Sequence, residues 1–125
     1  MVERMLHRIK CLHGDSRRQF YESLLFMLTA EMDLANPMNG NRGDRWGNRT
    51  RKRISVLVKL RGQVLAHYLF GPGCVIANRR RVLPTNTDVE FFGALHQEAS
   101  EHKIIQKQVW NIIGTALDAA GRRCN

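Results

Sequence analysis

The densest group of titratable side chains lies at residues 96–102, HQEASEH. Glu98 and His102 are four residues apart, a spacing that places both side chains on one face of a helix. A zinc peptidase needs two histidines in an H-E-x-x-H pattern, whereas His96 and His102 are separated by six positions and diverge around a helix. We interpret the group as a solvated helix face, and predict no metal site, no catalytic residue and no cofactor.

Other reactive side chains also have simpler explanations than catalysis. The carboxylates of Asp88 and Glu90 could hold the Mg²⁺ of a small nuclease, but they belong to a helix-capping box that begins at Thr87. His67 and Tyr68 are adjacent in a predicted strand, where they would lie on opposite faces and could not cooperate. The sequence has no nucleophile elbow or P-loop. We predict a protein that is not an enzyme and has no small-molecule substrate; a metal-dependent nuclease remains the second alternative.

Charge is the most unusual property of the chain. Twenty Lys and Arg against eleven Asp and Glu give a net charge of +9. Residues 36–61 hold eight basic side chains and one acidic one, net +7, and residues 62–84 add three arginines without an acid. Residues 1–35 are neutral and residues 85–125 carry a net −1. A basic surplus confined to one part of the chain indicates a polyanionic partner, with nucleic acid first.

Arginine outnumbers lysine by six to two in the basic segment, which favours bidentate contacts to phosphate. Trp46 lies among these arginines and could stack on a base or fold back on the domain as a lid. Each charge alone also fits a solvated strand face or the protection of a sheet edge. The occurrence of these basic side chains and Trp46 together in one part of the chain favours nucleic-acid binding. The predicted nucleic-acid-binding residues are Arg42, Arg45, Trp46, Arg49, Arg51, Lys52, Arg53, Lys59, Arg61, Arg79, Arg80 and Arg81.

Secondary-structure elements must position these side chains. Apolar residues recur at helical spacing in residues 1–35 and predict two helices. The second would begin at a capping box formed by Ser16 and Gln19 and end before Pro37. Residues 36–52 have no apolar periodicity and are dense in Asn, Gly and Arg, so we predict an exposed basic loop there.

A three-stranded antiparallel sheet is predicted for residues 53–83. The first strand would run to a turn at Gly62, with residues 64–70 as the second strand and residues 74–83 as the third. One face of this sheet would be basic and the other would pack on the helices. Leu57 is an exception to the alternation. The alternating apolar positions of the first strand are Ile54, Val56, Val58 and Leu60.

A helical C-terminal part completes the predicted architecture. The helix would begin at the Thr87 capping box, bend or break near residues 99–102 and end at Gly121. Apolar residues make up 43% of the 125 residues, which is ordinary for one globular domain. The expectation is a single α+β domain over residues 1–125, with the order α-α-β-β-β-α.

Three apolar residues predict self-association. Ile104, Trp110 and Leu117 lie off the main apolar stripe of the last helix, which leaves more apolar surface than one small domain covers. A homodimer would bury them and double the basic face. A protein-interaction or assembly module acting as a homodimer is therefore the first alternative to nucleic-acid binding.

RNA is preferred over DNA as the partner, and duplex RNA over single strands. The order helix, three strands, helix is similar to that of double-stranded RNA-binding domains, which recognise shape and backbone. The resemblance is one of topology, because their basic motif at the start of the last helix is replaced here by acidic residues. A small basic protein of this kind fits a viral protein that sequesters RNA or suppresses RNA silencing.

The cysteines and the N-terminal residues indicate in which cellular compartment the protein is expected. Cys11, Cys74 and Cys124 are widely spaced and form no C-x-x-C pair, which argues against a disulfide framework and a zinc site. No signal peptide is recognisable, and no apolar run approaches the length of about 20 residues that spans a bilayer. We predict an intracellular protein, cytoplasmic or nuclear, that is not secreted and has no membrane partner.

Overall fold

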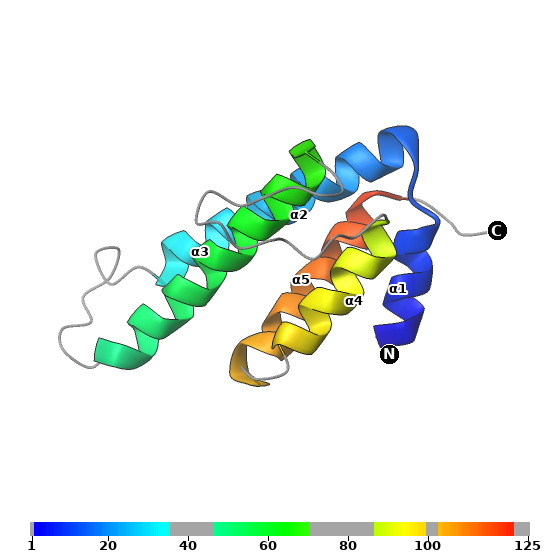
Figure 1. Cartoon of the computed structure of the whole chain (residues 1–125). Coiled ribbons are helices and arrows are strands. Elements are labelled where there is room, and N and C mark those ends of the chain that lie inside the picture. The colour runs from blue at the N-terminus through cyan, green and yellow to red at the C-terminus, as the bar shows by residue number, and fades with distance from the viewer. Residues whose placement is uncertain (1, 36–46, 71–86, 100–102, 122–125) are drawn as a thin grey trace.

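The computed structural model describes residues 2–35, 47–70, 87–99 and 103–121, and the fold in these ranges is helical (Figure 1). The polypeptide in each range folds into one or two helices that pack through their apolar faces. In chain order the helices are α1 (Val2–Lys10), α2 (Gly14–Ala35), α3 (Gly47–Phe70), α4 (Asp88–Ala99) and α5 (Lys103–Ala119).

The predicted α+β fold is wrong, because the described part of the chain contains no strand. The first two predicted strands and their turn form the continuous helix α3. Its buried positions are Leu57, Leu60, Val64 and His67, which follow helical spacing. Leu57, the exception to the strand pattern, is fully buried at 0% exposure, whereas Val58 is 49% exposed. The third predicted strand, residues 74–83, lies outside the described residues.

The predicted basic loop is also wrong for part of its length. Residues 47–52 are the first turns of α3, while residues 36–46 lie outside the described residues. These turns contain no apolar residue, so apolar periodicity could not reveal them. Arginine and lysine have high helix propensity, and a helix anchored farther along can extend through such residues.

Helix α2 is central to the arrangement. It packs against α3 on one side and against α5 on another, while α1 packs against α4 and α5. Figure 1 shows α2 and α3 as a long pair beside the pair α4 and α5, with α2 and α5 running in opposite directions. Aromatic rings from α2 and α4 meet in the core, where Phe20 packs edge-on against Tyr21 and Phe92.

Several predicted helix ends are confirmed. Thr87 Oγ1 accepts a hydrogen bond from the Glu90 N–H at 3.1 Å, as a capping box requires. Gly121 has a φ of +63°, the left-handed conformation expected after the last helix. The capping box predicted for α2, formed by Ser16 and Gln19, is wrong in register, because the helix begins two residues before Ser16. Ser16 is the third residue of α2, and its hydroxyl accepts a hydrogen bond from the His13 N–H at 3.2 Å.

The apolar residues that predicted a dimer are partly accounted for within the chain. Trp110 is 7% exposed and Leu117 is 2% exposed, so both belong to the core. The side chain of Ile104 lies outside the described residues. The argument for self-association is therefore wrong for Trp110 and Leu117. Large apolar side chains are exposed elsewhere, as at Phe26 and Leu34.

Two further observations concern the environment of the chain. Cys11, in the turn between α1 and α2, is disulfide-bonded, whereas the cysteine spacing had argued against a disulfide framework. The other cysteines, Cys74 and Cys124, lie outside the described residues. Within the ranges that the structure describes, no helix has the length and the apolar character to cross a membrane.

Candidate nucleic-acid interface and a buried polar cluster

Three of the predicted binding residues lie on the outer side of α3. Arg51, Lys52 and Lys59 are exposed, on the side of the helix away from its buried positions. Lys52 and Lys59 are two turns apart, about 10 Å along the axis, and project from nearly the same side. Between them the exposed side of α3 carries the small residue Ser55.

Arg53 has a different environment from its neighbours. Its Nη2 donates a hydrogen bond to Oε1 of Gln108 and lies 3.7 Å from Oε2 of Glu31. Gln108 in turn donates from Nε2 to Oε2 of Glu31 at 2.6 Å. Arg53 thereby connects α3 to α2 and α5, because Nη2 of its guanidinium contacts side chains of both helices.

Arg61 is likewise half-buried. Its Nε donates a hydrogen bond to Oγ1 of Thr29 on α2 at 2.8 Å. Arg53, Lys59 and Arg61 were expected on one basic strand face, but six residues of helix separate Arg53 from Lys59 by about a third of a turn. Among the described residues there is therefore no basic sheet face. The exposed cations of α3 in this part of the chain are Arg51, Lys52 and Lys59.

The other predicted binding residues lie beyond what the structure describes. The backbone of Arg49 belongs to α3, but its side chain is outside the described residues. Arg42, Arg45, Trp46, Arg79, Arg80 and Arg81 also lie there.

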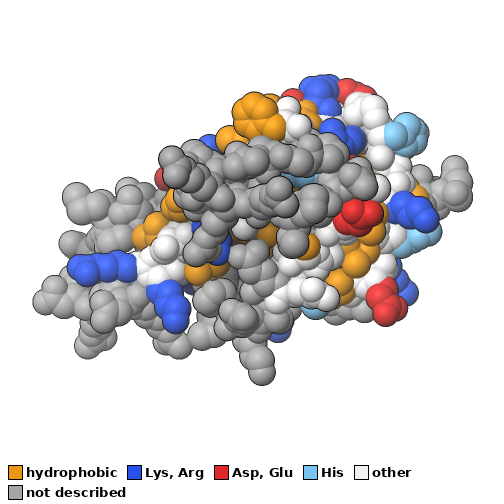
Figure 2. All heavy atoms as spheres, in the orientation of Figure 1, with side chains coloured by type: hydrophobic (Ala, Val, Ile, Leu, Met, Phe, Trp, Pro, Cys, Tyr) orange, Lys and Arg blue, Asp and Glu red, His pale blue; other side chains and the backbone are white. Residues whose placement is uncertain are grey.

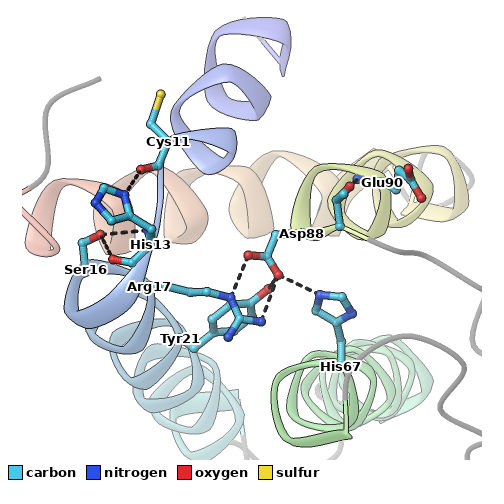
Figure 3. A network of polar contacts seen from close by, with 9 residues as sticks. Cys11, His13, Ser16, Arg17, Tyr21, His67, Asp88 and Glu90 are labelled. Atoms are coloured by element: carbon cyan, nitrogen blue, oxygen red, sulfur yellow. Dashed lines mark hydrogen bonds and ion pairs between the residues drawn. The ribbon is translucent and has the colours of Figure 1, made fainter. Parts of the chain in front are cut away.

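A partly buried polar cluster that the sequence did not reveal joins three helices (Figure 3). Asp88, the first residue of α4, accepts hydrogen bonds from Arg17 and Tyr21 of α2 and contacts His67 of α3. Arg17 Nε is 2.8 Å from Oδ2, and Tyr21 Oη is 2.8 Å from Oδ1. His67 Nε2 is also 2.8 Å from Oδ1. We call these four residues the Asp88 cluster.

Aromatic rings surround the Asp88 cluster. The ring of Phe91 stacks on His67 with centroids 4.2 Å apart, and Tyr68 stacks on Tyr21 with centroids 4.7 Å apart. The guanidinium carbon of Arg17 lies 4.9 Å from the ring centroid of Tyr21. His67 and Tyr68, expected on opposite faces of a strand, are neighbours on a helix; His67 belongs to the cluster and Tyr68 borders it. That earlier interpretation is wrong.

The electrostatics of the cluster favour an ionised Asp88. Burial alone would raise the pKa of Asp88, but hydrogen bonds from His67, Arg17 and Tyr21 outweigh it and hold that pKa well below the usual value. Burial, reinforced by the nearby carboxylate, raises the pKa of Tyr21, so its hydroxyl stays protonated. The hydrogen bond to Asp88 raises the pKa of Arg17.

The Asp88 cluster has the character of a structural clamp. His67 is 3% exposed, so a substrate cannot reach its ring without movement of α3 or α4. Its Nδ1 is buried without a hydrogen-bond partner among the described residues. An ionised carboxylate can only accept hydrogen bonds, and here its oxygens are occupied by donors from α2 and α3. We therefore assign the cluster to stability.

Two local signals in the sequence were consistent with the cluster. Arg17 and Tyr21 are four residues apart on one face of α2, and His67 continues the buried spacing of Leu60 and Val64. Asp88 was attributed to capping, which Thr87 performs. Contacts between residues 71 positions apart, as for Arg17 and Asp88, cannot be deduced from local spacing.

Within the described ranges, no group of three or more His, Cys, Asp or Glu side chains is arranged to hold a metal ion. Glu98 and His102 belong to the densest titratable group in the sequence. The backbone of Glu98 is part of α4, but its side chain is not described, and His102 lies outside those ranges. Comparison of the chain with protein-family models, with curated proteins and with solved structures finds no match.

Proposed function

We propose that this protein binds nucleic acid without catalysing a reaction, and that the outer side of the first half of α3 contacts the phosphate backbone. The observation that carries the proposal is the joint exposure of Arg51, Lys52 and Lys59 on a rigid helix. They belong to residues 36–61, which hold a net charge of +7. Figure 2 shows Lys and Arg side chains at the end of the molecule where α3 begins.

The helix itself adds to the attraction for phosphate. The first turn of α3 contains no acidic residue, so no side chain of that turn offsets the positive end of the helix dipole. Helix N-termini of this kind favour anions, and nearby cations strengthen the field. Contacts to phosphates release counterions, which makes the affinity strongly dependent on salt.

The experiment has to compare several forms of nucleic acid. The earlier preference for duplex RNA depended on a basic sheet that is absent from the described residues. An exposed helix fits the major groove of B-form DNA, whereas the major groove of A-form RNA is too narrow to admit one. Duplex DNA, duplex RNA and single strands of each therefore need to be compared.

The test is a titration of labelled probes by gel shift or fluorescence anisotropy, repeated at several salt concentrations. We expect binding that weakens steeply with salt and is reduced at least tenfold by the triple substitution Arg51→Ala, Lys52→Ala and Lys59→Ala. Absence of binding to every probe at low salt would refute the proposal. Mg²⁺-dependent cleavage of a probe would instead support a nuclease.

A further inference from the structure

A groove between α2 and α5 lies away from the Asp88 cluster and the outer side of α3. Its volume is about 300 Å³. Apolar and small polar side chains line it, with the hydrogen-bonded Glu31 and Gln108 also contributing. The other lining residues are Phe26, Met27 and Ala30 of α2 and Asn111, Ile112 and Thr115 of α5.

One residue at this groove is exposed to an unusual extent. Phe26 is 76% exposed, although it lies beside the partly buried Met27 and the buried Ile112. An exposed aromatic side chain next to an apolar hollow is typical of an interaction surface. The face therefore carries both a protruding ring and a recess that can receive one.

The distribution of charge along this face is self-complementary. Glu22 is exposed one turn before Phe26 on α2, where it is also paired with Arg18 at 3.3 Å, and Lys107 is exposed one turn before Asn111 on α5. Because α2 and α5 run in opposite directions, Glu22 and Lys107 lie toward opposite ends of the groove (Figure 1). A two-fold axis perpendicular to the groove would bring Glu22 of one copy opposite Lys107 of another.

We infer that the α2–α5 face is the interface of a symmetric homodimer, in which Phe26 of each copy occupies the groove of the other. A second copy of the chain fits this face, because the same face carries the ring of Phe26, the groove that can receive it, and the opposite charges of Glu22 and Lys107. An isologous interface requires such a self-complementary face. The interface is independent of nucleic-acid binding, so either can fail without the other.

The first test is sedimentation or size-exclusion chromatography with Phe26→Asp. We expect the wild-type protein to dimerise at micromolar concentration, and Phe26→Asp to raise the dimer dissociation constant at least 100-fold, because two rings and two grooves lose their contact. The matched control is Leu69→Asp, an exposed apolar residue of α3, 59% exposed. A monomeric wild-type protein, or a dimer disrupted by Leu69→Asp and not by Phe26→Asp, would overturn the inference.

The second test uses the charges. Glu22→Lys and Lys107→Glu should each weaken the dimer about threefold to tenfold at low salt, because each places like charges across the interface. The two variants mixed with each other should form a heterodimer tighter than either homodimer, since opposite charges then meet at both ends of the interface. Equal affinity of all combinations would refute the predicted orientation. Circular dichroism of each variant confirms that the helical fold is retained.

Discussion

Replacing Asp88 by Asn tests whether its half-buried carboxylate clamps α2, α3 and α4 together. Oδ1 accepts hydrogen bonds from Tyr21 and His67, each at 2.8 Å, and from Arg17 Nη2 at 3.1 Å, while Oδ2 accepts from Arg17 Nε at 2.8 Å. If the amide oxygen of Asn takes the position of Oδ1, the amide nitrogen faces Arg17 Nε, donor against donor. In the opposite orientation the three hydrogen bonds to the Oδ1 position, from Tyr21, His67 and Arg17 Nη2, are lost instead.

The size of the effect follows from these contacts. The orientation with the amide oxygen at the Oδ1 position loses fewer contacts. In it the hydrogen bond from Arg17 Nε to the carboxylate is lost, and losing a hydrogen bond to a charged group costs about 1.5–3 kcal/mol. Arg17 is 33% exposed and can be hydrated after the change, so the cost stays below the 3–5 kcal/mol of a fully buried pair that loses one member. We expect Asp88→Asn to lower the free energy of unfolding by about 2 kcal/mol and the melting temperature by about 8 °C.

The assay is urea denaturation followed by circular dichroism, with Glu90→Gln as the matched control. Both residues are acidic and lie in the first turn of α4, so both changes remove the same favourable interaction with the helix dipole. Glu90 is exposed, and we expect its substitution to cost about 0.5 kcal/mol or less. Equal effects of the two substitutions would refute the clamp.

Two further predictions concern stability. Because the pKa of Asp88 is lowered in the folded state, its stabilising contribution is complete above about pH 4, the pKa in an unfolded chain, and is lost as the pH falls further. The difference in unfolding free energy between the wild type and Asp88→Asn, measured between pH 7 and pH 2, should therefore shrink progressively as the pH falls below about 4; a constant difference would contradict this. Gly62→Ala should raise the melting temperature by about 3 °C, because Gly62 is exposed within α3 and an added Cβ meets nothing within 4 Å. Destabilisation by Gly62→Ala would instead support a turn at this position.

The ends of the chain were predictable from local signals. The helices of residues 1–35, the cap at Thr87, the break before α5 and the glycine at 121 all follow from apolar spacing or capping residues. These features depend on neighbours a few positions away, so a single sequence contains the necessary information.

The middle of the chain was not predictable in the same way. Ile54, Val56, Val58 and Leu60 alternate as in a strand, but apolar residues also occur on several sides of α3, so two periodicities compete. Full burial of Leu57 decides between them, and that burial depends on α2 packing beside it. The internal contacts of Arg53 likewise depend on distant helices, which is why it was grouped with the exposed cations.

The central claim, that the outer side of α3 contacts phosphates, is tested most directly by comparing salt dependence in two double variants. Arg51→Ala with Lys52→Ala removes two exposed cations from α3, and Arg4→Ala with Lys10→Ala removes two from α1. We predict that the slope of log K against log salt for duplex binding falls by about 2 in the α3 variant and is unchanged in the α1 variant. Equal slopes in the two variants would contradict the claim.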